Sequence, residues 1–291
     1  MKTVKEIKKE ADTLYQKSSH YIAETFIAIG AVVAIAKGML EIVGVHTGIE
    51  YLFLLSVLFS PLELGMIKAS LMAFDRRAKE VKTAEYTLMG LTNYFKIFVP
   101  FVGRTLIVYV LEALILAVFV YVSMGSFEMF AMFLESVLAG NLGNILSNKD
   151  IVLTVGTLSG VVVTLISAFV IDAYFSLSYY FVVEDDMSLS ESISASIYCM
   201  NGNIGKYIGI KLQYIIPTII AAIAVNFVTI AFQTLFQQLL TIVAVPLIIF
   251  NVMLVVITAF VSSFISVMLY KVKETLAYTV FYRDLKDNYY E

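Results

Sequence analysis

The sequence has few of the residues that soluble enzymes and nucleic-acid-binding proteins use. Only 15% of the 291 residues are charged, and there are two histidines, one cysteine and no tryptophan. The single cysteine, Cys199, excludes an intramolecular disulfide and a multi-cysteine metal or iron–sulfur site. The net charge of −3 leaves no basic excess, so we expect no nucleic-acid partner.

Sequence motifs of the common enzyme classes are also missing. The chain contains no H-E-x-x-H zinc motif, no P-loop and no G-x-S-x-G serine elbow. The histidines, His20 and His46, leave little for metal binding or acid–base catalysis. We therefore expect a protein without catalytic residues, cofactor or metal site.

What the sequence does contain is apolar residues. They make up 60% of the chain, and the mean hydropathy is +0.87. Because a soluble domain is about half apolar and about a quarter charged, this composition predicts an all-α polytopic membrane protein. Barrel strands alternate polar and apolar residues, whereas the apolar runs here are unbroken. The six predicted transmembrane helices are residues 20–45, 51–74, 97–123, 151–183, 207–231 and 246–270.

The distribution of basic residues predicts the orientation. With both termini in the cytoplasm, sixteen of the twenty Lys and Arg residues lie in cytoplasmic segments and only Lys149 lies outside. Lys37, Lys68 and Arg104 fall within predicted spans. We therefore expect a multi-pass protein with a cytoplasmic tail at 271–291.

Amphipathic segments precede several of the outward spans. Residues 1–19, 79–94 and 188–202 each predict a cytoplasmic surface helix, and Ser188 with Glu191 forms a capping box at the start of the last one. This order suggests a three-fold helical-hairpin pseudo-repeat, with units 1–75, 76–184 and 185–270. The alternative is that basic amphipathic connectors are common to any membrane protein built from hairpins.

Ionisable residues inside predicted spans are costly and by default indicate function. Of the acids in these spans, Glu63 and Glu112 lie near mid-span and Asp172 lies toward the inner half. Lys68 and Arg104 lie at similar inner depth and could neutralise two of the three. One interpretation is a buried ion network that fixes helix packing. The other is a polar cavity, open to the cytoplasm, that binds a proton, a cation or a lipid headgroup.

Pro61 is the helix-kinking candidate next to Glu63. It leaves the carbonyl of Val57 without its usual donor and predicts a kink in the second span. Such a kink beside a buried acid is one way to line a cavity, although proline is ordinary in membrane helices.

Several stretches resemble a known family. They are SPLELG at 60–65, YFSLSYY at 174–180 followed by EDD at 184–186, SISASIYCMNG at 192–202 and AYTVFYRDL at 277–285. These stretches resemble the signatures of the bacterial integral-membrane family called domain of unknown function 975, common in Firmicutes. That family is distantly similar to the membrane domain of some glycerophosphodiester phosphodiesterases. The resemblance implies a helical fold in the bacterial cytoplasmic membrane, without an established activity or site.

Three functions remain open from the sequence. The first is a non-enzymatic accessory or scaffold factor in envelope assembly, secretion or stress tolerance, with a membrane-protein partner. The second is a transporter-like or lipid-handling protein with a buried charged cavity and a bound lipid or solute. The third, with less support, is the permease subunit of an ABC system. In each case the lipid bilayer is the surrounding medium.

Overall fold

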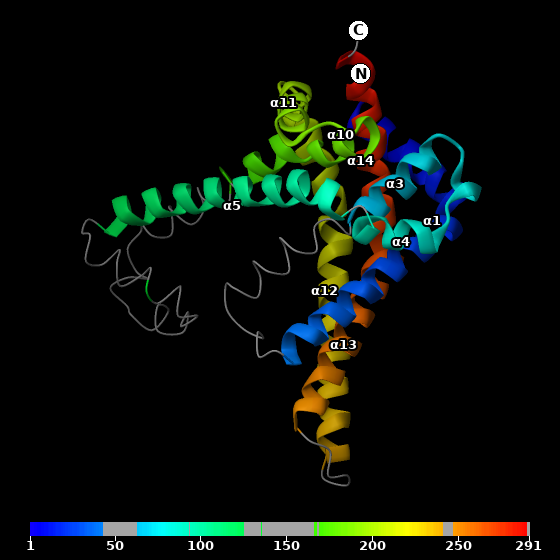
Figure 1. Ribbon diagram of the computed structural model, residues 1–291, viewed down its shortest axis with the longest axis vertical. Helices are drawn as coiled ribbons and strands as arrows, with labels where there is room; N and C mark the ends of the chain where they lie inside the picture. The colour runs from blue at the N-terminus through cyan, green and yellow to red at the C-terminus, as the bar shows by residue number, and fades with distance from the viewer. Residues whose placement is uncertain are drawn as a thin grey trace.

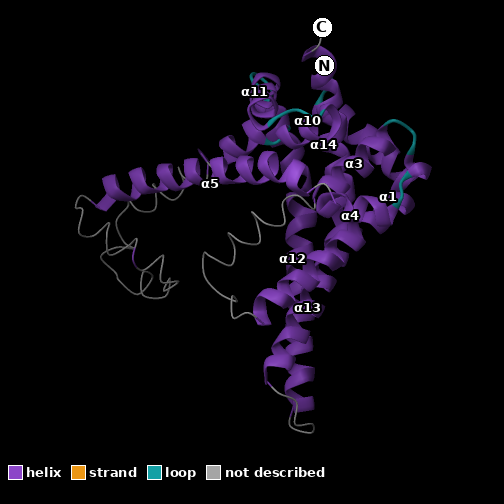
Figure 2. Cartoon of the chain, in the orientation of Figure 1, coloured by secondary structure: helices purple, strands orange, loops and turns teal. Residues whose placement is uncertain are grey.

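The computed structural model describes residues 1–42, 63–92, 94–124, 135, 166–167, 169–240 and 247–289. Every regular element in these residues is a helix (Figure 2), as the sequence predicts. Figure 1 shows long helices that run down from one end of the molecule, where both chain termini lie, and shorter helices gathered around that end. The all-helical class follows directly from the apolar composition.

Three helices in the described part are long and apolar enough to cross a membrane. They are α1 (Val4–Ile42), α12 (Ile204–Leu240) and the run formed by α13 (Leu247–Ser266), the π-helical turn η3 (Val267–Lys271) and α14 (Val272–Tyr289). The apolar side chains of α12 are largely exposed: Ile216 is 66% and Phe227 71% exposed. A helix that is apolar on every face is stable only when lipid or protein surrounds it. The exposure of these side chains therefore fits a membrane protein.

These three helices overlap the first, fifth and sixth predicted spans. The third predicted span, 97–123, lies within α5 (Tyr94–Met124), which extends across the direction of α12 and α13 in Figure 1. The second predicted span is described only from α3 (Glu63–Phe74), and residues 151–165 of the fourth lie outside the described residues. The six-span count and the three-fold repeat therefore stay predictions.

The two ends of the chain differ from the segments expected in the sequence. Helix α1 continues from Val4 to Ile42, so the expected surface helix and first span are one helix. The expected tail at 271–291 is mostly α14, whose side chains Leu276, Phe281 and Tyr282 are fully buried. Although α14 carries many polar residues, its apolar residues recur at helical spacing and form one face of the core.

The fourth predicted span is not one continuous helix in its described part. Helical residues 169–175 are followed by a turn at Ser176 and Leu177, after which α10 (Ser178–Asp185) begins. Ser196 of α11 (Leu189–Met200) holds this turn: its hydroxyl donates to the carbonyl of Tyr174 at 2.6 Å and accepts from the N–H of Leu177 at 3.2 Å. The break is thus stabilised by a residue from another helix, which local sequence does not reveal.

The expected surface helices are present as helices. Residues 79–94 contain the end of η2 (Ala78–Glu80) and all of α4 (Thr83–Thr92), and residues 188–202 contain α11. The predicted capping box at Ser188 is confirmed, with the Ser188 N–H donating to the Glu191 carboxylate at 3.0 Å. These hydrogen bonds from Ser188 hold the pKa of Glu191 below its usual range.

The core lies at the end of the molecule that carries both termini. Tyr282 of α14 stacks on Tyr180 with ring centroids 5.0 Å apart and meets Phe181 edge-on at 5.1 Å. On the other side, α3 approaches α4 so closely that a Cβ at Gly65 would collide with the carbonyl oxygen of Tyr86. Gly65 closes the SPLELG stretch, so the glycine of that motif has a packing role here.

Ion pairs tie α14 to the residue that follows α3 and to the end of α10. We call Asp75, Glu184, Asp185, Arg283 and Lys286 the C-terminal ion cluster. Arg283 contacts Asp75 at 2.9 Å and Glu184 at 2.5 Å, and Lys286 contacts Glu184 at 3.1 Å and Asp185 at 2.6 Å. Each cation bridges two carboxylates, so the cluster joins three segments that are distant in the sequence.

Candidate ligand-binding cavity

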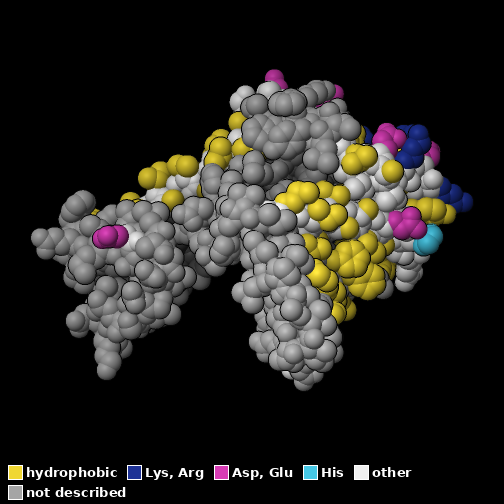
Figure 3. Space-filling view, turned by 60° about the horizontal axis from the view of Figure 1, so that its bottom comes forward, with side chains coloured by type: hydrophobic (Ala, Val, Ile, Leu, Met, Phe, Trp, Pro, Cys, Tyr) yellow, Lys and Arg dark blue, Asp and Glu magenta, His cyan; other side chains and the backbone are white. Residues whose placement is uncertain are grey.

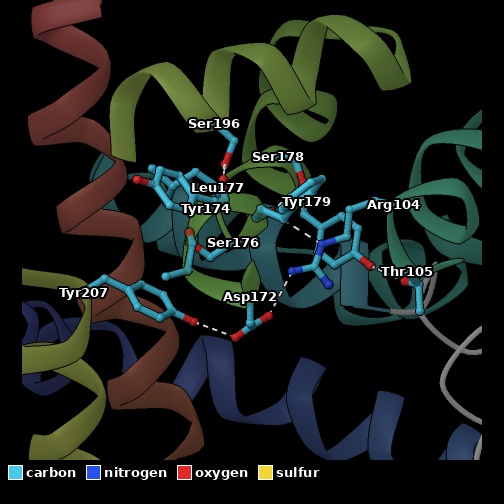
Figure 4. Close-up of polar contacts among 12 residues, drawn as sticks. Arg104, Thr105, Asp172, Tyr174, Ser176, Leu177, Ser178, Tyr179, Ser196 and Tyr207 are labelled. Atoms are coloured by element: carbon cyan, nitrogen blue, oxygen red, sulfur yellow. Dashed lines mark hydrogen bonds and ion pairs between the residues drawn. The ribbon is translucent and has the colours of Figure 1, made fainter. Parts of the chain in front are cut away.

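A single carboxylate, Asp172, joins three segments of the chain. It lies between Arg104 of α5, at 3.0 Å, and Lys211 of α12, at 2.9 Å. The hydroxyl of Tyr207, one turn before Lys211, donates to the second Asp172 oxygen at 2.8 Å (Figure 4). We call these four residues the Asp172 cluster. Its hydrogen bonds are charge-assisted, which makes them stronger than neutral ones.

Arg104 is held on several sides. Its guanidinium lies 4.8 Å from the ring centroid of Tyr179, and the Tyr179 hydroxyl shares a hydrogen bond of 2.6 Å with Thr105. The Arg104 side chain is only 12% exposed, whereas that of Asp172 is 33% exposed. The cation is therefore fixed by an aromatic face, while the carboxylate remains accessible.

Lys211 is held by aromatic rings from the other side of the cluster. Its ammonium lies 4.5 Å from the ring centroid of Phe169 and 5.4 Å from that of Tyr207. One third of its side chain is exposed. The ammonium is thus positioned by rings and by one carboxylate, with part of its surface open.

The cluster lines a cavity of about 350 Å³. The π-helical turn η3 and the start of α14 contribute Lys271, Glu274 and Tyr278 to its wall. Single π-helical turns are frequent at functional sites because they turn side chains away from the regular helix spacing. The remaining polar groups of the wall include the hydroxyls of Tyr179 and Tyr180.

Cations and carboxylates both line the described wall. Two cations, Arg104 and Lys211, share this one carboxylate, and Lys271 lies 3.9 Å from Glu274. In addition, the hydroxyl of Tyr278 is buried at this wall, beside Tyr207. The wall therefore offers cationic groups and a hydroxyl donor, which suit an anionic group.

The structure brings together two of the residues expected from the sequence, Arg104 and Asp172. Lys68 lies in α3, next to Met66 and Ile67, which line the cavity, but Lys68 itself does not. Glu63 begins α3 and Glu112 lies within α5, and their side chains are outside the described part, as is Pro61. The polar network predicted for Glu63 and Glu112, and the helix kink predicted for Pro61, therefore stay predictions.

Sequence reasoning missed Tyr207, Lys211, Lys271 and Glu274. Tyr207 and Lys211 lie at the start of the fifth predicted span, where the basic residues are counted as cytoplasmic. Their spacing of four residues puts them on one helix face, and that is the signal that could have paired them with Asp172. Lys271 and Glu274 had no comparable signal, since they fell in the expected tail.

Two other chemical possibilities are limited by the described residues. Within them, no group of three His, Cys, Asp or Glu side chains is placed to hold a metal ion. Cys199 is only 5% exposed, and burial raises the pKa of its thiol to about 11, which keeps it protonated near neutral pH. Cys199 is therefore a packed, protonated thiol.

No protein-family model, curated protein or solved structure matches the chain. The resemblance to the bacterial membrane family stays a prediction.

Proposed function

We propose that the chain is a non-enzymatic integral membrane protein that binds a small anionic ligand in the cavity around Asp172. The anion is either a free solute or the headgroup of a lipid. The proposal retains the predicted bacterial cytoplasmic membrane, the six spans with their hairpin repeat, and the family resemblance. The observation that carries it is the sharing of one carboxylate by Arg104 and Lys211 at the wall of the cavity.

The proposed topology places both termini in the cytoplasm. In its support, Figure 1 shows the N- and C-termini at the same end of the molecule, and the backbone N–H of Lys2 donates to the Asp284 carboxylate at 2.8 Å. The C-terminal ion cluster lies at that end as well. A cavity near it is reached from the cytoplasm.

An anion would be stabilised here for an electrostatic reason. In a medium of low dielectric constant, the partly exposed ammonium of Lys211 at the cavity wall attracts an anionic group more strongly than it would in water. The hydroxyl of Tyr278 can donate a hydrogen bond to the same group. An uncharged solute would gain from neither.

The test is ligand retention by the full chain in mild detergent. Native mass spectrometry records the bound mass, and thermal unfolding is followed with added inorganic phosphate or glycerol phosphate. We expect Lys211→Met to lose the retained anion and the phosphate-dependent rise in unfolding temperature. Lys206→Met removes a charge from the same helix outside the cavity wall and should keep both.

Three outcomes separate the alternatives. A retained phospholipid indicates a lipid headgroup, and a rise with glycerol phosphate alone indicates a soluble anion. A protein that carries no anion and does not respond to either phosphate contradicts the proposal and leaves Asp172 as part of a structural ion network.

The accessory or scaffold role is the second candidate, and one observation favours it. Helix α11 exposes Ile197 and Tyr198 at the end of the molecule with both termini; Tyr198 is 68% exposed. Exposed apolar side chains at such a position suit a protein partner. A stoichiometric protein in the same mass spectra would support this role, and an ATPase subunit would support the permease alternative.

A further inference from the structure

A second hollow lies between α1 and the end of α3, and it shares no lining residue with the Asp172 cavity. Its volume is about 650 Å³. Its floor is apolar, formed by Leu14, Tyr21, Ala73, Phe74 and Ala78. Its rim carries three cations, Lys17, Arg76 and Lys79, and one carboxylate, Glu10. We call this hollow the α1–α3 groove.

The charge of the groove is positive. Glu10 contacts Lys2 at 2.6 Å, so its carboxylate already has a cation. Among the described residues, none of the three rim cations forms an ion pair within 4.0 Å. The two hydroxyl groups of the groove already donate within α1: Thr13 donates to the carbonyl of Lys9, and Ser18 donates to the carbonyl of Leu14. They therefore have no hydroxyl proton left to donate to a ligand. Recognition of a ligand therefore falls to the cations.

Arg76 occupies a backbone position that normally holds glycine. Its φ is +61°, in the left-handed region. The N–H of Arg76 donates to the carbonyl of Ala73 and that of Arg77 to the carbonyl of Met72, which is the Schellman arrangement at the end of α3. Glycine adopts this conformation without the steric penalty that a side chain brings. An arginine kept at this cost is consistent with a role for its charge.

The groove lies where the apolar part of α1 begins and where α3 ends. Lys17 is one turn before the stretch 21–36 of α1, which contains a single charged residue, Glu24. Arg76 follows the last residue of α3, Phe74, by two positions. Figure 3 shows basic side chains at the flank of the molecule, close to apolar surface. This is the depth at which phospholipid headgroups lie when such helices cross a bilayer.

We infer that the α1–α3 groove binds the headgroup of an anionic phospholipid, with the phosphate against Lys17, Arg76 and Lys79 and the start of an acyl chain over Leu14 and Phe74. Basic pockets between membrane helices on the cytoplasmic side recognise such headgroups by charge. The apolar floor distinguishes a lipid from free phosphate, because only a lipid buries apolar surface there. The inference rests on the protein spanning a membrane, and it is independent of the ligand of the Asp172 cavity.

The test compares lipids that differ in charge. The full chain in detergent is titrated with phosphatidylglycerol or with phosphatidylcholine of the same acyl chains, and the unfolding temperature and the number of retained lipids are measured. We expect phosphatidylglycerol to stabilise the protein and to be retained at lower concentration than phosphatidylcholine. Inorganic phosphate should change the unfolding temperature of the wild type and of a groove variant by the same amount.

Arg76→Gly is the most informative variant. It removes the charge and relieves the backbone, so the lipid-free protein should unfold at the same or a higher temperature than the wild type. Its apparent affinity for phosphatidylglycerol should fall about fivefold, the effect of one basic residue at a membrane surface. Stability and lipid binding then change in different directions, which misfolding cannot produce.

Two controls make the result decisive. Lys82→Gln removes an exposed lysine that pairs with Glu85 at 3.6 Å and does not line the groove, and it should keep the wild-type affinity. Lys211→Met should also keep it, even where it loses the ligand of the Asp172 cavity. Equal affinity of Arg76→Gly and wild type for phosphatidylglycerol, or an equal loss in Lys82→Gln, would overturn the inference.

Discussion

The Asp172 cluster and the C-terminal ion cluster use the same residue types in opposite proportions. At the C-terminal end, two cations meet three carboxylates, and each cation bridges two of them. Around Asp172, two cations meet one carboxylate beside a cavity of about 350 Å³. The C-terminal ion cluster holds helices together. The Asp172 cluster also connects helices, but its cations line an open cavity. The adjoining cavity therefore distinguishes the candidate site from the structural cluster.

The largest effect on stability is expected at Arg283. Replacing it with Met leaves Asp75 and Glu184 without their shared cation at a half-buried position. Removing one partner of a buried ion pair costs about 3 kcal/mol, so the unfolding temperature should fall clearly. Ligand retention by the remaining folded protein should not change. A variant as stable as the wild type would contradict the fastening role of this cluster.

Asp172→Asn should destabilise the protein less and change its response to anions. The substitution leaves Arg104 and Lys211 facing a neutral amide, which we expect to cost about 2 kcal/mol. An added anion can replace the lost carboxylate, so phosphate should raise the unfolding temperature more than it does in the wild type. The measurement is thermal unfolding with increasing phosphate at constant ionic strength. An unchanged phosphate response would show that the cations serve packing alone.

The smallest effect is expected for Tyr207→Phe. This change removes the hydrogen bond of 2.8 Å to Asp172 and keeps the ring between Phe169 and Tyr278. A hydrogen bond to a charged group contributes about 1.5 kcal/mol or slightly more. Chemical unfolding of the purified variant measures this loss. A matched change, Tyr15→Phe, keeps the aromatic face 4.7 Å from Lys273 and should have no comparable effect.

Much of the helical architecture could be predicted because it depends on local sequence. The apolar runs predicted helices at α1, α12 and α13, and Ser188 with Glu191 predicted the start of α11. These predictions rest on hydrophobic burial and on backbone groups within one turn, which the order of residues specifies. The capping box is the clearest example, since both of its residues lie within four positions.

The candidate site was predicted only in part. Asp172 and Arg104 were found because a charge in an apolar run is unusual wherever its partner lies. Lys211 was overlooked because a lysine near the start of a predicted span is typical of the basic cytoplasmic border. The turn at Ser176 and Leu177 was also missed, since the hydroxyl that stabilises it belongs to Ser196, in a different helix.

The sequence by itself determined that the chain is helical and apolar enough for a membrane. It also determined that most of the basic residues lie outside the predicted spans. These properties follow from composition and short-range periodicity. The tertiary structure alone decided that α14 packs in the core, that Asp172 is shared by Arg104 and Lys211, and that Lys17 and Arg76 border one groove. Each of these depends on contacts between residues far apart in the chain, and local patterns do not specify which distant residues meet.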